Sequence, residues 1–188
     1  MSFILLGILN SQETAAGAAG YDLLETTILS TTTASVTFSS LGSYSAYKHL
    51  QIRAVMKDNA GSTNLNRMDV RFNSDQGSNY TYHYLNGTGS SVASSAGTSQ
   101  SKLQFFDVIG GGSNNLRYGA IILDILDFNN TNKNKTVRGF GGGFVASEND
   151  ISLSSGVWLN TNAITSIEIF GNFNYAAGSR FSLYGIAG

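Results

Sequence analysis

Few residues in this 188-residue chain could carry acid–base chemistry. It has two histidines, His49 and His83, and no cysteine. A serine hydrolase needs a nucleophile, a base and an orienting acid, and the G-x-S-x-G turn that often presents the nucleophile is missing. His49 begins an alternating segment and His83 lies among tyrosines, so packing or surface roles explain both histidines more simply. We therefore expect no nucleophilic active site.

Three carboxylates flank apolar segments, at Asp107, Asp124 and Asp127. A hydrolase that uses two carboxylates needs them to face each other across the substrate. Asp124 and Asp127 have opposite parity along a strand, so their side chains should point to opposite faces of a sheet. Acceptors that satisfy backbone or arginine donors at a sheet end are the simpler explanation. The sequence predicts no catalytic residues.

Metal and cofactor motifs are equally sparse. Residues 73–77, Asn-Ser-Asp-Gln-Gly, resemble the start of a calcium loop, but the glutamate that closes such a loop is absent. A turn explains these residues as well. The glycine runs at 110–112 and 141–143 lack the Lys-Ser/Thr ending of a phosphate loop. We expect neither a metal nor a cofactor.

The composition indicates a surface that is suited to contact with other proteins. Charged residues make up 12% of the chain, against roughly 25% in an average globular protein. Ser, Thr, Asn and Gly replace them, and hydroxyls and amides cost less to desolvate than ions. The net charge is −1 and no Lys/Arg cluster occurs, which excludes a nucleic-acid partner. The chain should be largely covered by other protein or should work outside a cell.

The segments that position these residues are predicted to be β-strands. The densest apolar run, Gly119–Phe128, lies between asparagine-rich turns and is apolar at both parities, so we expect a central strand packed on both faces. Strand patterns also occur at 21–29, 35–38, 49–56, 68–72, 103–109, 136–144, 151–159, 164–170 and 180–186, with 80–84 either a strand or irregular. Nine or ten strands without a long helix predict an all-β, antiparallel sandwich or barrel.

Two further expectations concern neighbouring segments. The alternating segments 49–56 and 68–72 are predicted to pair, with Arg53 and Arg71 on outward faces. Residues 87–101 are almost wholly Gly, Ser, Thr and Ala, which predicts a long exposed loop.

The chain opens with an apolar segment that is too short for a membrane helix and lacks the positive start of a signal peptide. We expect residues 1–20 to form an apolar arm with an Ala/Gly joint, and residues 21–188 to form one β-sandwich domain. The arm could fold back onto its own core or dock into another subunit. In the second case its interface residues would be Phe3, Ile4, Leu5, Leu6, Ile8 and Leu9.

Several short sequence segments, taken in order along the chain, resemble those of a family of tailed-bacteriophage virion structural proteins. They are His49–Arg53, Gly77–Tyr80, Ile122–Phe128 before Thr131–Arg138, Ser155–Thr161 before Ala163–Ile167, and Gly178–Ile186. The resemblance extends from Tyr21 onward. It implies a jelly-roll or related β-sandwich, often trimeric, on the capsid as a decoration (cement) protein or on tail fibres and baseplates. No functional residues carry over from it.

Between these roles, a compact domain with an apolar arm and no coiled coil, collagen-like stalk or β-helix repeat favours a capsid decoration protein. Its partners would be the major capsid protein and sister subunits in a homotrimer. It would be made in the bacterial host cytoplasm and sit on the outer surface of the virion. No membrane partner is expected.

The alternative is a tail-fibre or baseplate receptor-binding module. Its sugar-stacking candidates for a host surface glycan are Tyr80, Tyr82, Tyr84 and Trp158, unless these aromatic residues pack in the core. A third reading, a glycan hydrolase, would need paired acids in a cleft.

Overall fold

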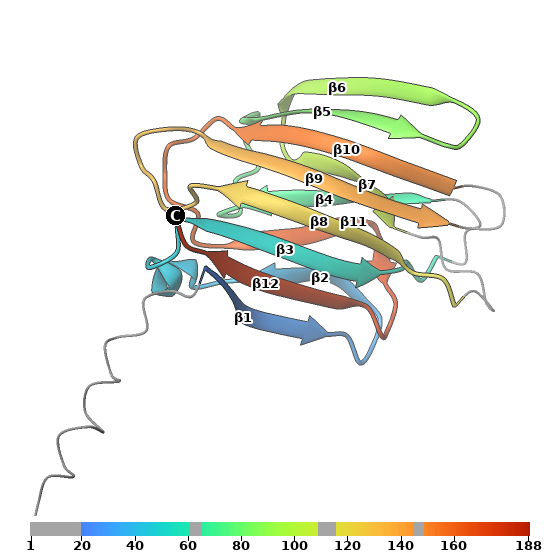
Figure 1. The fold of residues 1–188 in the computed structure, drawn as a ribbon, viewed down its shortest axis with the longest axis horizontal. Helices are drawn as coiled ribbons and strands as arrows, with labels where there is room; N and C mark the ends of the chain where they lie inside the picture. The colour runs from blue at the N-terminus through green and yellow to red at the C-terminus, as the bar shows by residue number, and fades with distance from the viewer. Residues whose placement is uncertain (1–19, 61–64, 109–115, 145–148) are drawn as a thin grey trace, which may run out of the picture.

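The computed structural model describes residues 20–60, 65–108, 116–144 and 149–188. Within these ranges the chain forms two antiparallel β-sheets that face each other, and a single 3-10 turn, η1 (Leu41–Tyr44) (Figure 1). The antiparallel sandwich predicted from the sequence is confirmed.

The two sheets differ in size. The larger sheet has eight strands in the spatial order β1 (Tyr21–Ile28), β12 (Arg180–Ile186), β3 (His49–Met56), β8 (Gly119–Leu126), β9 (Lys135–Phe144), β10 (Asn149–Trp158), β5 (Tyr80–Gly87) and β6 (Val92–Gln100). The smaller sheet has four strands in the order β2 (Thr33–Phe38), β11 (Ile167–Tyr175), β4 (Asn66–Phe72) and β7 (Leu103–Val108).

The connectivity is that of a jelly roll with two insertions. Without β5, β6, β9 and β10, the strand orders are β1-β12-β3-β8 and β2-β11-β4-β7. Such orders arise when one long antiparallel hairpin wraps into two sheets, so that the first strand pairs with the last and the second with the one before the last. The hairpins β5–β6 and β9–β10 extend the larger sheet beyond this framework (Figure 1).

The core lies between the sheets and follows the alternation of each strand. On β3, the side chains of Leu50, Ile52, Ala54 and Met56 are buried, as the alternating sequence predicts. Burying one large aliphatic side chain contributes about 1.5–3 kcal/mol. The sandwich is therefore held mainly by apolar side chains that the two sheets share.

The strand β8 is central, as predicted, but it is not packed on both faces. It lies between β3 and β9 in the larger sheet. Its odd-numbered residues are buried, whereas Ile122 is 39% exposed. The expectation of two covered faces is wrong for the described part of the chain, because the smaller sheet covers only the inner face of the larger one.

Two other expectations are also wrong. Strands β3 and β4 do not pair, because β3 lies between β12 and β8 whereas β4 pairs with β11 and β7 in the other sheet. Alternation shows which face of a strand is buried but not which strand lies beside it. Residues 92–100 form β6 instead of a loop. This edge strand is exposed on both faces, so its sequence carries no alternating apolar signal.

Candidate functional site

Of the predicted arm, residues 1–20, only Gly20 lies within the described residues. The proposed interface residues Phe3, Ile4, Leu5, Leu6, Ile8 and Leu9 are therefore not placed by the structure.

The candidate sugar-stacking aromatics are mostly buried, as in the core-packing alternative that the sequence left open. Tyr80 and Trp158 are 0% and 1% exposed, and their rings stack with centroids 6.3 Å apart. The Tyr80 hydroxyl donates to the backbone carbonyl of Asp75 at 3.2 Å, and burial raises the pKa of Tyr80 to about 12. Tyr84 is also buried. The even-numbered residues of β5 face inward, which gives these rings a core role.

Tyr82 is the exception, because it is only partly buried. It lies near the edge of the sandwich, and its hydroxyl donates a hydrogen bond to Oε1 of Gln104 on β7. This contact joins the β5–β6 insertion to the smaller sheet, so Tyr82 also has a structural partner.

The outer face of the larger sheet carries an apolar patch that the sequence analysis did not identify. Its members are exposed by between 39% and 74%, and they come from six adjacent strands. We call this set the outer-face patch: Val55, Ile122, Phe140, Ile151, Leu153, Leu85 and Val92. Apart from Val55 and Ile122, all its members lie on the two inserted hairpins.

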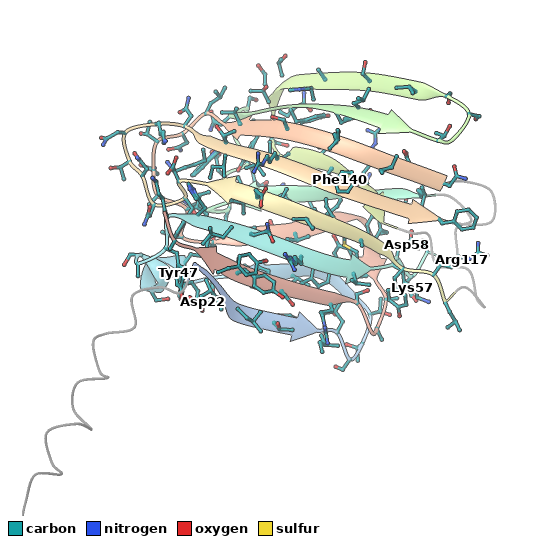
Figure 2. The ribbon with its side chains drawn as sticks, in the orientation of Figure 1. Asp22, Tyr47, Lys57, Asp58, Arg117 and Phe140 are labelled. Atoms are coloured by element: carbon teal, nitrogen blue, oxygen red, sulfur yellow. The ribbon has the colours of Figure 1, made fainter. Side chains whose placement is uncertain are left out.

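Strand register makes the patch continuous. One row of directly opposed residues crosses the sheet from Ile122 through Phe140 and Leu153 to Leu85. Directly opposed side chains in antiparallel sheets are close enough to touch. Figure 2 shows Phe140 over β9 on the face of the larger sheet that is turned to the viewer. A shallow hollow of about 430 Å³ lies beside it, lined by Val55, Ile122 and Ile151 among others.

The hairpin β9–β10 carries large apolar side chains on its outer face, and two of its inward-facing positions are glycines. Gly139 and Gly156 occupy buried positions that face β7. A Cβ on Gly156 would lie 2.6 Å from Cδ2 of Leu103, and one on Gly139 would lie 3.0 Å from Cδ1 of Phe105. The core has no room for a side chain at these two positions, whereas Phe140, Ile151 and Leu153 of the same hairpin are exposed on the outer face.

A polar network borders the patch on one side. Gln51 donates to Oδ1 of Asp124 at 2.7 Å, and Arg138 donates to Oδ2 at 2.9 Å. Tyr21 and Arg53 both donate to Oε1 of Gln51, at 2.6 and 2.9 Å. The apolar surface thus has a hydrogen-bonded polar edge, as the rim of a protein interface does.

The three candidate carboxylates do not converge. Asp124 belongs to this polar network, and the side chain of Asp107 lies outside the described residues. Asp127 pairs with Lys133, whose hydrogen bond and charge lower the pKa of that carboxyl. The described residues contain no group of three His, Cys, Asp or Glu side chains that could hold a metal ion.

The turn at residues 73–77 is built as the sequence suggested. The Asp75 carboxylate accepts hydrogen bonds from the Gly77 backbone, Asn79 and Trp158, at 2.8, 2.9 and 2.8 Å. Burial alone would raise the pKa of Asp75, but these hydrogen bonds outweigh it and lower the pKa. The carboxylate is used to close a turn and anchor Trp158.

Lys135 is a buried cation whose structural role the sequence did not reveal. Its ammonium group donates to the backbone carbonyls of Asn130, Lys133 and Thr161 at 2.5, 2.9 and 2.9 Å. The side chain is fully buried. Burial lowers the pKa of Lys135. These three hydrogen bonds connect the β8–β9 turn to the segment after β10.

Among the residues that the structure describes, no helix has the length and apolar character to cross a bilayer. No protein-family model matches this chain, and no curated protein matches it. One solved structure with some likeness is exo-inulinase from Aspergillus awamori, at 10% sequence identity and a TM-score of 0.36. The match covers 89% of this chain and 29% of that enzyme, and a likeness at this level carries no information on activity.

Proposed function

We propose that this chain is a non-enzymatic structural protein of a tailed-bacteriophage virion, which binds the outer surface of the assembled capsid shell and stabilises it. The supporting observation is the outer-face patch, an exposed apolar surface that extends over six adjacent strands. Contiguous apolar patches of this kind typically mark sites of protein binding. The resemblance to virion proteins supplies the kind of partner.

The chemistry of the larger sheet suits a protein partner. Phe140 stands at the middle of the apolar row, between Ile122 and Leu153. Aromatic side chains at the centre of an interface commonly contribute most of the binding energy. The chain as a whole is rich in hydroxyls and amides, and the charges of Arg53, Asp124 and Arg138 at the edge of the patch are already hydrogen-bonded, which limits the cost of desolvation on binding.

Stabilisation of the shell follows from selective binding. A protein that binds only the assembled, expanded shell lowers its free energy relative to the disassembled subunits by mass action. The partner would be the major capsid protein, and the arm at Phe3–Leu9 would make a second contact with the shell or with a sister subunit of a homotrimer.

The test uses purified protein and capsids that have been stripped of it. Phe140→Glu places a charge at the centre of the patch, so we expect attachment, measured by co-sedimentation, to fall at least about tenfold. Leu159→Glu is the matched control, because Leu159 is 49% exposed against 48% for Phe140 but lies outside the patch. Equal attachment of the two variants would show that the patch is not the contact.

Copy number separates the capsid role from the tail-fibre or baseplate alternative. A decoration protein is present at a copy number close to that of the capsid protein, whereas a fibre or baseplate component is far less abundant. Tyr80, Tyr84 and Trp158 are buried, so the receptor-binding alternative loses most of the residues that motivated it. Attachment to isolated tails but not to shells would reject the decoration role.

A further inference from the structure

The smaller sheet opens between β4 and β11. Their pairing stops at Asp69 and Phe170, although β4 begins at Asn66 and β11 continues to Tyr175. The register of β11 against β2 also shifts between Phe170 and Tyr175, so this part of β11 bulges. A cleft of about 310 Å³ lies in the opening, lined by Asn66, Arg67, Asp69, Gln104, Asn172 and Phe173 among others.

Asp69 lines this cleft, and one of its carboxylate oxygens, Oδ1, has no hydrogen-bond donor. The residue is 3% exposed, and its Oδ2 accepts a hydrogen bond from the Lys102 ammonium. Its Oδ1 is also buried but has no hydrogen-bond partner. Burial raises the pKa of Asp69, although Lys102 and Gln104 act against the rise. A buried acceptor without a donor is costly, and a ligand hydroxyl could supply that donor.

The other lining groups complement this acceptor. Gln104 lies directly opposite Asp69 on β7, and its Oε1 accepts from Tyr82. Its amide NH₂ is the donor end and acts on the Asp69 carboxylate, whose pKa it lowers. Arg67 contributes a guanidinium, which can only donate. Phe173 packs its ring edge-to-face on Tyr175 and presents a partly buried apolar wall.

We infer that this cleft between β4 and β11 binds one unit of a neutral, hydroxyl-rich ligand, a sugar residue. A sugar hydroxyl both donates and accepts, so adjacent hydroxyls can donate to Asp69 and accept from Arg67 or an amide. The apolar face of the sugar ring then meets Phe173. The cleft has the size of a small-molecule site.

Ions fit the cleft less well than a sugar. A metal ion would compete with Lys102 for Asp69, and the described residues hold no cluster of three acidic or imidazole ligands. An anion would be repelled by the negative charge of the Asp69 carboxylate. A neutral ligand with hydroxyl groups avoids both costs.

This inference is independent of attachment to a capsid. Met68 and Val70 are buried in the core, so Asp69 between them points to the outer face of the smaller sheet. The outer-face patch is on the opposite side of the sandwich. A chain bound through the patch would therefore hold the cleft away from its protein partner, where a glycan could reach it.

The experiment is an NMR titration of the full ¹⁵N-labelled chain with glucose, galactose, mannose, N-acetylglucosamine and N-acetylgalactosamine. We expect at least one sugar to shift the side-chain amide signals of Gln104 and Asn172 saturably. Asp69→Asn should weaken that sugar's affinity at least about tenfold, because a charged hydrogen-bond acceptor is lost. Asp124→Asn, on the other sheet, should leave the affinity unchanged.

Thermal unfolding checks that each variant is folded. Asn172→Ala, at an exposed position in the bulge, provides a second variant that should also weaken binding without disturbing the core. The absence of a saturable shift with every sugar would overturn the inference. Undiminished affinity in both Asp69→Asn and Asn172→Ala would also overturn it, as would saturable shifts from magnesium, calcium or phosphate alone.

Discussion

Ile122 and Leu123 are consecutive residues of β8 that face opposite environments. Leu123 is fully buried between the two sheets, whereas Ile122 points to the outer face and lies opposite Phe140. One strand thus contributes to the core with one face and to the outer-face patch with the other. The apolar residues on the outer face are available for a partner because the fold does not use them internally.

This relationship predicts unequal costs for truncating the two side chains. Leu123→Ala should lower the free energy of unfolding by about 2–5 kcal/mol, because it leaves a cavity in the core. Ile122→Ala should lower the free energy of unfolding by less than about 1 kcal/mol, because the side chain is already 39% exposed to water. Urea denaturation of both variants measures the difference. Similar losses would mean that the outer face is covered in the free protein.

The close approach of β7 to the inserted hairpin predicts a penalty at Gly156. A Cβ there would lie 2.6 Å from Leu103 and 3.1 Å from the Thr81 carbonyl oxygen, so Gly156→Ala should lower the free energy of unfolding by about 1–3 kcal/mol. Gly87→Ala is the control, because its nearest contact would be an ordinary 3.8 Å. Thermal unfolding of both variants measures the effect, and a neutral Gly156→Ala would contradict the close packing.

Lys135 should be necessary for stability. Lys135→Met removes the donor to three backbone carbonyls and should destabilise the fold by at least about 2 kcal/mol, because buried acceptors lose their partner. Lys133→Met is the matched control in the same turn. Lys133 is 54% exposed, so the loss of its pair with Asp127 should cost less than about 1 kcal/mol. Equal losses in chemical denaturation would contradict the buried role of Lys135.

The turn at Asp75 predicts a pH dependence. Its pKa is lower in the folded state than in the unfolded state, where an aspartate titrates near about 3.9. The carboxylate therefore stabilises the fold above that pH, and this contribution is lost as the pH falls through the folded-state pKa. A ¹³C NMR titration of the carboxyl group should give a value below the unfolded one.

Asn79→Ala tests the cause of that shift, because it removes one of the donors to Asp75. The pKa of Asp75 should rise, and the acid unfolding midpoint should move to higher pH. A titration curve for Asp75 that does not change in this variant would show that the hydrogen bond does not set the pKa.

The role proposed for the N-terminal arm can be tested separately from the patch. Deletion of Ser2 to Leu9 should abolish attachment to stripped capsids, and adding back the intact chain should raise their disruption temperature. Replacing the same residues with a Gly/Ser segment of equal length controls for chain length and should also fail to attach. Unchanged attachment of the deleted form would reject the arm as a contact.

The sequence by itself determined most of the strands, and the buried face of each strand whose apolar residues alternate. The ranges of β3 and β12 agree with the alternating segments at 49–56 and 180–186, and the apolar run at residue 119 begins the central strand β8. These features depend on neighbours in the chain, because a strand that is buried on one face must alternate.

Tertiary structure alone decided which strands pair and which surfaces remain open. β3 lies beside β12 and β8, from distant parts of the chain, and the smaller sheet covers only one face of the larger one. Trp158 and Tyr80 are buried because they lie on the inner face, which the smaller sheet covers, whereas Phe140 lies on the outer face of β9, which no layer of the described chain covers. Apolar composition shows that a residue can be buried, but only long-range packing determines whether another layer is present to bury it.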